Sequence, residues 1–418
     1  MLQVFSSSWA LLLGMMLLMV GNGLQGTLLG VRGGLEGFST FEMSFVMSAY
    51  FAGFLGGSRL APEMIRRVGH VRVFAALASF ISAILILYPA FAHPVAWAIG
   101  RVAIGFCFSG VYVTAESWLN NSADNTNRGK ALSVYMIVQM FGIVSAQILL
   151  TLGDASGYAL FIVSSVLVSI SFAPILLSIS PTPAFETAKP MPLKTLMLTS
   201  PLGCFGMFLL GGVFSAQFGM SAVYGVAAGL TIKQISLFVS SIYVGALLMQ
   251  YPIGWFSDRV DRRLVILFVA AFGGLMSLVA FLFDQYFGAL LVAAFVIGGT
   301  SNPLYSLLIA YTNDYLEADD MAAAAGGLVF INGMGAISGP LVTGWMMETF
   351  GTSAFFMVIA ILMLTLTGYA GYRMTQRTRD GIEDGAYAPV MPSASPVAVE
   401  VASEYYIETA LDEETNER

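Results

Sequence analysis

Apolar stretches of about 20 residues recur along the whole chain, and no other sequence feature constrains the fold as strongly. Such a stretch, folded as an α-helix, is long enough to cross the hydrocarbon core of a bilayer, which is about 30 Å thick. Of the 418 residues, 57% are hydrophobic and 10% are charged, whereas about a quarter of the residues of a soluble domain are charged. A soluble fold cannot bury so much apolar surface. The sequence therefore predicts an integral membrane protein.

Twelve stretches of this kind predict an all-α polytopic fold with 12 transmembrane helices. The first stretch, from Trp9 to Leu29, is preceded by no Lys or Arg and followed by no A-x-A-like cleavage site, so we expect a retained helix and not a signal peptide. The expected helices lie at residues 9–29, 41–58, 73–92, 95–118, 130–151, 157–178, 201–223, 234–256, 264–283, 287–311, 323–346 and 353–372.

Lys and Arg residues are distributed unequally between the two sets of loops that connect these helices. Positive charge resists translocation, so loops rich in Lys and Arg are expected in the cytoplasm. The poorer side has two such residues, Arg32 and Lys233. The richer side has fourteen, namely Arg59, Arg66, Arg67, Arg72, Arg128, Lys130, Lys189, Lys194, Arg259, Arg262, Arg263, Arg373, Arg377 and Arg379. Both termini are therefore expected in the cytoplasm, as an even number of helices also requires.

Two polar segments divide the chain. We expect residues 1–180 to form an N-terminal six-helix bundle, residues 181–200 a cytoplasmic linker and residues 201–372 a C-terminal six-helix bundle. Residues 373–418 contain ten acidic residues and four Arg, which account for −6 of the formal net charge of −7. This last segment contains several Pro residues and shows no apolar periodicity. It is expected to be a disordered acidic cytoplasmic tail.

An internal repeat relates the two halves of the chain at a shift of about 192 residues. Both copies contain a hydroxyl residue followed three positions later by an acceptor: Ser39 with Glu42, and Thr231 with Gln234. This spacing is that of a capping box, in which the two side chains bond free backbone N–H groups at a helix start. It gives Glu42 a structural role, which we favour over proton carriage.

The repeat continues inside the expected helices. At a shift of about 193 residues, Gly105 lies over Gly298, and Tyr112 lies over Tyr305. Six helices per copy is an even number, so the two bundles insert in the same direction and are related by a pseudo-twofold axis along the membrane normal. This is the parallel-repeat arrangement of transporters, in which the substrate site lies between the bundles near the middle of the membrane.

Amides and phenols inside the expected helices are the candidate substrate-binding residues, because polar side chains cost free energy when they face lipid. Six of them form repeat-related pairs, and two lie about one helical turn from a member of a pair. The candidates are Gln25, Gln217, Gln139, Asn332, Tyr112, Tyr305, Asn22 and Asn302. The alternative is that these groups only bond neighbouring helices. Since all eight are neutral, they favour a small organic solute that is neutral or zwitterionic.

The loop after the eighth expected helix reads Gly-Trp-Phe-Ser-Asp-Arg-Val-Asp-Arg-Arg at residues 254–263. It resembles the G-x-x-x-D-R-x-x-R-R signature of the major facilitator superfamily (MFS), and the resemblance extends over residues 9–372. In that superfamily the Asp and Arg residues of this loop clasp neighbouring helix ends and steady one state of the transport cycle. The resemblance therefore implies the MFS fold and a gating role for Asp258, Arg259 and Arg263.

Charged residues of the fourth expected helix are further candidates for coupling or gating. Arg101 and Gly105 resemble the superfamily's R-x-x-x-G element, which is implicated in proton coupling, and snorkelling of Arg101 to the outer interface is the alternative. The resemblance to sugar porters implies a gating ion pair between Glu116 and Arg128, with proton carriage by Glu116 as its second interpretation. Residues 115–120 look most like an uncharacterised bacterial YcaD-like branch of the superfamily.

The favoured function is alternating-access transport of a small organic solute, with coupling to protons by symport or antiport expected. A transporter-like receptor or scaffold that acts through the acidic tail is the alternative. Neither His70 nor His93 has metal-ligand spacing or a nucleophile beside it, so an enzyme is not expected. Cys107 and Cys204 fall in apolar runs, and no P-loop or basic patch occurs. We therefore expect a monomer in the cell inner (plasma) membrane, surrounded by lipids, with no cofactor, metal or nucleic-acid partner.

Overall fold

The computed structural model describes residues 2–122, 128–177, 191–376 and 386–416, and within these ranges the regular structure is helical, with no β-strand. The helices of the first part of the chain are α1 (Leu2–Leu35), α2 (Thr40–Val68), α3 (His70–Ala90), α4 (Pro94–Ser122), α5 (Arg128–Leu152), α6 (Ala159–Ser171) and α7 (Ala173–Leu177). Those of the second part are α8 (Leu193–Thr199), α9 (Pro201–Ala227), α10 (Ile232–Ser257), α11 (Arg262–Leu282), α12 (Phe287–Asn313), α13 (Ala318–Phe350), α14 (Ala354–Gln376) and α15 (Pro396–Asn416). The predicted all-α class is confirmed.

Eleven segments of the described chain are long and apolar enough to cross a membrane. They belong to α1, α3, α4, α5, α6 continued by α7, and each helix from α9 to α14. The remaining long helix, α2, has 29 residues but carries Arg59, Glu63, Arg66 and Arg67 toward its end. It packs against α4 and α13, so it runs beside two of the apolar helices.

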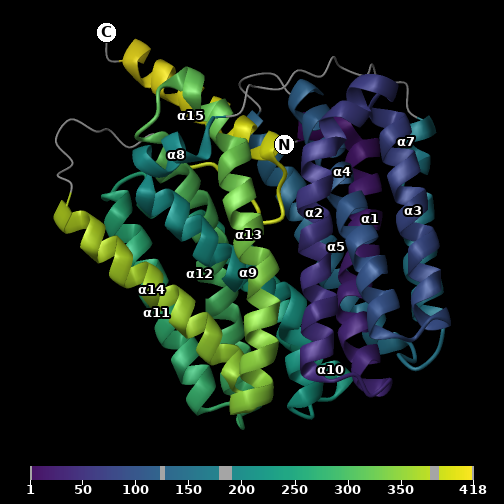
Figure 1. Cartoon of the computed structure of the whole chain (residues 1–418). Coiled ribbons are helices and arrows are strands. Elements are labelled where there is room, and N and C mark those ends of the chain that lie inside the picture. Colours follow the sequence, from purple (N-terminus) through teal and green to yellow (C-terminus); the bar gives the residue numbers. More distant parts are fainter. Residues whose placement is uncertain (1, 123–127, 178–190, 377–385, 417–418) are drawn as a thin grey trace.

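Two groups of helices form the molecule, and both chain termini lie at the same end of it (Figure 1). We call α1 to α7 the first half and α8 to α14 the second half. The packing partners correspond: α2 packs on α4 as α10 packs on α12, α1 on α5 as α9 on α13, and α3 on α6 as α11 on α14. The end with both termini also holds the last residues of α2, including Arg67, and the turn with Arg259. We call it the basic end, and the opposite end the far end.

Both predicted capping boxes are present at the far end. At the start of α2, the backbone N–H of Glu42 donates to Ser39 Oγ at 3.1 Å, and that of Ser39 donates to the Glu42 carboxylate at 2.8 Å. At the start of α10, the N–H of Gln234 donates to Thr231 Oγ1 at 3.3 Å, and that of Thr231 donates to Gln234 Oε1 at 2.9 Å. These bonds confirm the capping prediction and account for Glu42 without proton carriage.

Close helix crossings explain the glycines that recur in the two halves. Gly105 of α4 lies so close to α2 that a Cβ there would collide with the carbonyl oxygen of Tyr50, and Gly53 of α2 lies equally close to α4. The crossing of α10 and α12 uses Gly245 and Gly298 in the same way. Small residues let helix backbones approach closely within a membrane. The alignment of these glycines in the sequence therefore has a packing cause.

Residues 386–416 contradict the prediction of a disordered acidic tail. Residues 386–395 run without regular structure between the two halves at the basic end, and α15 follows, packed against α13, α4, α5 and α12. The prediction is therefore wrong for this part of the chain, because contacts from both halves supply the order that local composition lacks. Residues 377–385 and 417–418, and residues 181–190 of the predicted linker, lie outside the described residues. The rest of that linker includes α8.

Candidate functional site

A cavity lies between the two halves and contains about 1090 Å³ of space free of protein atoms, including the part open to solvent. Helices α1, α2, α4 and α5 of the first half and α9, α10 and α13 of the second half line it. Five of the eight predicted substrate-binding residues are part of the lining, namely Asn22, Gln25, Tyr112, Gln217 and Asn332.

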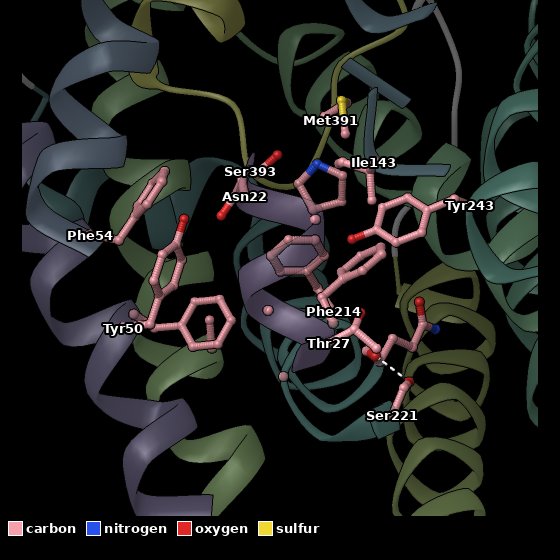
Figure 2. A pocket seen from close by; sticks show the side chains of 18 of the residues that line it. Asn22, Thr27, Tyr50, Phe54, Ile143, Phe214, Ser221, Tyr243, Met391 and Ser393 are labelled. Carbon is pink, nitrogen blue, oxygen red and sulfur yellow. Dashed lines mark hydrogen bonds between the residues drawn. The ribbon is translucent and has the colours of Figure 1, made fainter. Parts of the chain in front are cut away.

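Aromatic side chains from both halves line this cavity (Figure 2). The ring centroids of Phe214 and Phe218 are 4.4 Å apart, and those of Phe218 and Tyr243 are 4.6 Å apart. Phe51 of α2 approaches Phe214 across the interface, with centroids 6.0 Å apart, and Tyr50 lies next to it. Aromatic faces of this kind suit a flat or apolar part of a bound solute.

Arg101 is the only charged side chain among the described residues that line the cavity. It is 4% exposed, its Nη1 donates to Gln25 Oε1 at 3.2 Å, and its guanidinium carbon lies 4.6 Å from the ring centroid of Tyr50. Gln25 Nε2 in turn donates to Asn22 Oδ1 at 3.2 Å. Within the described chain, Arg101 Nε has no hydrogen-bond partner and no carboxylate forms a salt bridge with the guanidinium. Arg101 therefore points inward to α1 and α2 and does not snorkel.

The second half contributes two amides to the lining. Gln217 Oε1 accepts a hydrogen bond from Ser301 Oγ at 3.0 Å, while Gln217 Nε2 has no partner among the described residues. Asn332 Nδ2 donates to a backbone carbonyl of α9 at 3.1 Å. Tyr112 of the first half donates to the sulfur of Met19 at 3.3 Å. Gln217 thus keeps donors for a ligand, whereas Asn332 and Tyr112 also join neighbouring helices.

Three predicted substrate-binding residues, Gln139, Tyr305 and Asn302, are not among the residues that line the cavity. Gln139 and Asn302 are 2% exposed and Tyr305 is fully buried. Asn302 Nδ2 donates to a carbonyl of its own helix at 3.4 Å. The repeat pairs positions along two helices, but it does not fix which side of each helix faces the cavity. The sequence therefore predicted one site for all eight residues, whereas the structure places these three outside the cavity lining.

A buried ion pair joins the start of α11 to the end of α12 at the basic end. Arg262 Nη1 lies 2.6 Å from Asp314 Oδ1 and 2.7 Å from Oδ2, and the two side chains are 1% and 3% exposed. Arg262 Nε also donates to Ser257 Oγ at 3.0 Å. The signature loop therefore does clasp a neighbouring helix end, but through Arg262, which the motif alone did not single out.

The three signature-loop residues with a predicted gating role make other contacts. The Asp258 carboxylate accepts a hydrogen bond from the backbone N–H of Tyr387 at 2.9 Å. The guanidinium carbon of Arg259 lies 4.2 Å from the ring centroid of Trp255. Arg263 pairs at 2.8 Å with the aspartate that caps its own helix. Asp258 thus connects the loop to residues 386–416, which we call the C-terminal segment.

Glu116 of α4 also contacts the C-terminal segment. Its side chain is buried, at 2% exposed, and its carboxylate accepts hydrogen bonds from the backbone N–H of Ser395 at 3.0 Å and from the Ser395 hydroxyl. The hydroxyl of Tyr135 lies 3.5 Å away. Arg128 begins α5, but its side chain lies outside the described residues, so the ion pair of Glu116 with Arg128 stays a prediction.

His70 occupies in the first half the position that Arg262 occupies in the second, at the repeat shift of about 192 residues. It is 1% exposed, and its Nε2 lies 2.9 Å from Ser117 Oγ. Of the basic residues nearby, Arg67 pairs with Glu63 on the exposed side of α2. The two halves therefore differ at the basic end: an ion pair is buried in one and a His–Ser contact in the other.

The most unexpected part of the lining comes from the C-terminal segment. Met391, Pro392 and Ser393 border the cavity, and Figure 2 shows Met391 and Ser393 on the segment that enters it beside Ile143 and Asn22. The sequence carried one signal for this placement. The residues that follow Pro396 are mostly small and apolar, unlike the acidic remainder of the tail. In the structure they are buried and belong to the hydrophobic core.

Comparisons with known proteins agree with this architecture. The profile of the Major Facilitator Superfamily matches residues 6–232 and 203–392. An uncharacterized MFS-type transporter of Escherichia coli, YcaD, is 27% identical over 372 residues, which are 87% of this chain and 95% of YcaD. The solved structure of the nucleoside transporter NupG has a TM-score of 0.72 and 16% identity, over 88% of this chain and 98% of NupG. That of the E. coli fucose:proton symporter FucP has a TM-score of 0.56 and 15% identity, over 87% of this chain and 98% of FucP. The chain belongs to the major facilitator superfamily.

Proposed function

We propose that this protein carries a small organic solute across the inner (plasma) membrane by alternating access of its two halves. Membership of the superfamily and the likeness of its fold to those of transporters support secondary transport. The observation that carries the proposal is the central cavity, to which seven helices of both halves contribute. In this proposal α2 is the twelfth span, so that each half has six.

The basic end is the cytoplasmic end in this proposal. The sequence assigns fourteen Lys and Arg residues to one set of loops against two in the other, and those of the first set that the structure describes include Arg67 and Arg259 at the basic end. Such a bias orients membrane proteins with the positive side in the cytoplasm. Both termini then lie in the cytoplasm.

The solute that suits the cavity best carries one negative group next to a flat or apolar body, as many zwitterions do. A buried guanidinium without a carboxylate partner is costly, and a carboxylate or phosphate group of a solute would satisfy its free donors. The cavity lining of described residues contains no Asp or Glu that competes for Arg101. The aromatic residues around Phe218 and the unpartnered Nε2 of Gln217 provide contacts for the rest of the solute. Between the neutral and zwitterionic classes suggested by the sequence, we therefore favour the zwitterionic one.

Proton coupling is the second part of the proposal. Arg101 and Glu116 are buried on the same helix, about four turns apart. Protonation of Glu116 removes the negative charge that accepts two hydrogen bonds from Ser395. A proton taken up there would therefore weaken the contact of α4 with the C-terminal segment.

A ligand-dependent thermal-shift screen on the purified full-length protein tests the proposed function. Zwitterionic, singly anionic and neutral organic solutes form the panel, and a solute that binds the native state raises its melting temperature. Gln217→Ala removes an amide from the cavity wall and is expected to weaken binding about tenfold. Gln139→Ala makes the same change outside the cavity and is expected to keep the affinity within about twofold.

Two results would count against the function. Either no solute in a broad panel shifts the melting temperature, or the Gln217 and Gln139 variants lose affinity equally. The second outcome removes the central cavity as the binding site while leaving superfamily membership untouched.

A further inference from the structure

Residues 386–409 fill the space between the two halves at the basic end, and we infer that they form a plug that blocks this end of the cavity and keeps the two halves from closing there. This inference rests on the proposed alternating-access function, to which it adds a regulatory element. The superfamily profile matches up to residue 392, so α15 lies beyond the matched ranges.

At the far end the two halves touch each other directly. Ser48 of α2 donates a hydrogen bond to a backbone carbonyl of α13. Gly344 of α13 lies against Ser44 of α2, and Gly34 of α1 lies against Val226 of α9, in both cases so closely that a Cβ would collide. The far end is therefore closed by contacts between the halves themselves.

At the basic end the C-terminal segment stands between the halves and bonds to both. On the first half, Glu116 accepts the two hydrogen bonds from Ser395. On the second half, the Ser306 hydroxyl donates to the carbonyl oxygen of Val390 at 3.1 Å and accepts from its N–H at 2.9 Å. Further along α12, Asn313 donates to a serine of α15 at 3.1 Å. The segment thus satisfies buried polar groups on both sides of the opening.

The segment is packed like protein core and not like an appended tail. Eight of its apolar residues are at most 6% exposed: Ala388, Val390, Met391, Ala394, Ala398, Val399, Val401 and Ala402. Protein interiors are close-packed, so the facing sides of α4 and α12 cannot meet while these residues lie between them. For the same reason a solute in the cavity cannot pass Met391, Pro392 and Ser393 to leave at the basic end.

The segment also reaches the loop that clasps helix ends. The hydroxyl of Tyr406 donates to Asp314 Oδ1 at 2.9 Å, on the carboxylate that pairs with Arg262. The backbone N–H of Tyr387 donates to Asp258. Release of the plug therefore breaks one hydrogen bond to each of these aspartates, so that its position and the arrangement of the signature loop depend on each other.

Thiol labelling tests whether the plug covers the opening in solution. Cys107→Ser and Cys204→Ser remove the native thiols, and Ser306→Cys then supplies the single cysteine. Its thiol is a weak donor and acceptor, so it keeps the contact with Val390. Truncation after Gln376 is expected to raise the rate at which this thiol reacts with a small polar maleimide at least about tenfold. The reason is that the reaction then no longer requires local opening of the plug. In the full-length chain, Ser395→Asp puts a second carboxylate next to Glu116 and is expected to act in the same direction.

Thr409→Asp is the matched control for Ser395→Asp. It adds the same charge to α15, about 20 Å farther along the helix, and is expected to leave the labelling rate unchanged. Variants are compared after elution as a single species in gel filtration, and the truncated chain supplies the answer if Ser395→Asp does not fold. Equal labelling of the full-length and truncated chains would overturn the plug.

Distances between spin labels test the conformational consequence. Val68 and Val260 are repeat-related, exposed positions at the basic end, and Phe41 and Lys233 are their counterparts at the far end. Truncation is expected to add a population with a shorter distance at the basic end and a longer one at the far end. Unchanged distributions at both ends contradict the inference. Neither measurement needs a solute, so failure of the plug is distinguishable from failure of the solute screen.

Glu400 on α15 predicts that the plug is held more weakly as the pH rises. Burial and the nearby Glu404 raise the pKa of Glu400 from 4.5 to about 7, and Arg59, Glu63 and Arg66 of α2 line the same crevice. A carboxyl group whose pKa is raised by docking makes its full contribution to docking when the pH is below the pKa of the undocked state. This contribution is lost as the pH rises through about 7. Protection of the Ser306→Cys thiol, expressed as the labelling rate of the truncated chain over that of the full-length chain, should therefore fall severalfold between about pH 5 and pH 8. Glu400→Gln should abolish this fall and leave only the opposite effect of Glu116, whose protonation at low pH weakens the contact with Ser395. A fall of unchanged size in that variant would rule out Glu400 as its source.

Discussion

Replacing Arg101 by alanine is expected to weaken the binding of a solute with a negative group by about 100-fold, because truncating one member of a buried hydrogen-bonded charge pair costs about 2–5 kcal/mol. Arg101→Lys keeps the charge but loses the planar fork of donors, so a loss of about tenfold is expected. The measurement is a titration of each purified variant with the solute found in the screen, and with an analogue of the same solute in which an amide replaces the negative group.

The analogue separates a loss of charge pairing from a loss of structure. It is expected to bind the native protein and the Arg101→Ala variant with similar affinity, since it has no negative group for Arg101 to pair with. Arg72→Ala, which removes an arginine exposed at the start of α3, is the control for a general effect of net charge. If Arg101→Ala binds the anionic solute as tightly as the native chain does, the favoured solute class is wrong and a neutral solute is favoured instead.

Replacing Arg262 by alanine is expected to lower the free energy of unfolding by about 3–5 kcal/mol, because the buried Asp314 carboxylate then loses its ion pair with Arg262. The matched control is Arg67→Ala, which breaks the pair with Glu63 at a side chain that is 75% exposed. An exposed pair contributes about 0–1 kcal/mol, so the control should change stability little. Chemical unfolding of both variants in the same detergent gives the comparison.

A double variant shows whether the cost comes from the loss of the ion pair. Arg262→Met combined with Asp314→Leu removes both charges and is expected to recover most of the stability, since a buried ion pair is often replaceable by apolar residues of similar volume. Equal losses in Arg262→Ala and Arg67→Ala would show that the buried pair does not clasp α11 to α12.

Some features could be predicted from the sequence because their causes lie within a few residues or occur in both halves of the repeat. The capping boxes at Ser39 and Thr231 need residues only three positions apart, and both formed as expected. The glycines at positions 105 and 298 aligned because two helix crossings have the same close geometry. The amides at Gln25 and Gln217 aligned and both line the cavity.

Features that depend on helix phase or on distant contacts could not be predicted in this way. The signature motif predicted a gating role for Asp258, Arg259 and Arg263, but the side chain that forms the ion pair at the end of α12 is that of Arg262. The acidic composition of the tail indicated disorder, and the order of residues 386–416 comes from the opening that they fill. Sequence patterns report which residues favour an element, while partners far along the chain decide where it docks.

Counterflow in proteoliposomes tests the central claim most directly. Vesicles that contain the full-length protein and the unlabelled solute from the screen are diluted into a trace of labelled solute, with and without a pH gradient. The proposed carrier predicts transient accumulation of the labelled solute, faster after truncation at Gln376 and weaker in Gln217→Ala. A protein that binds the solute but shows no accumulation in any of these forms would be a receptor with a transporter fold, and alternating access would be contradicted.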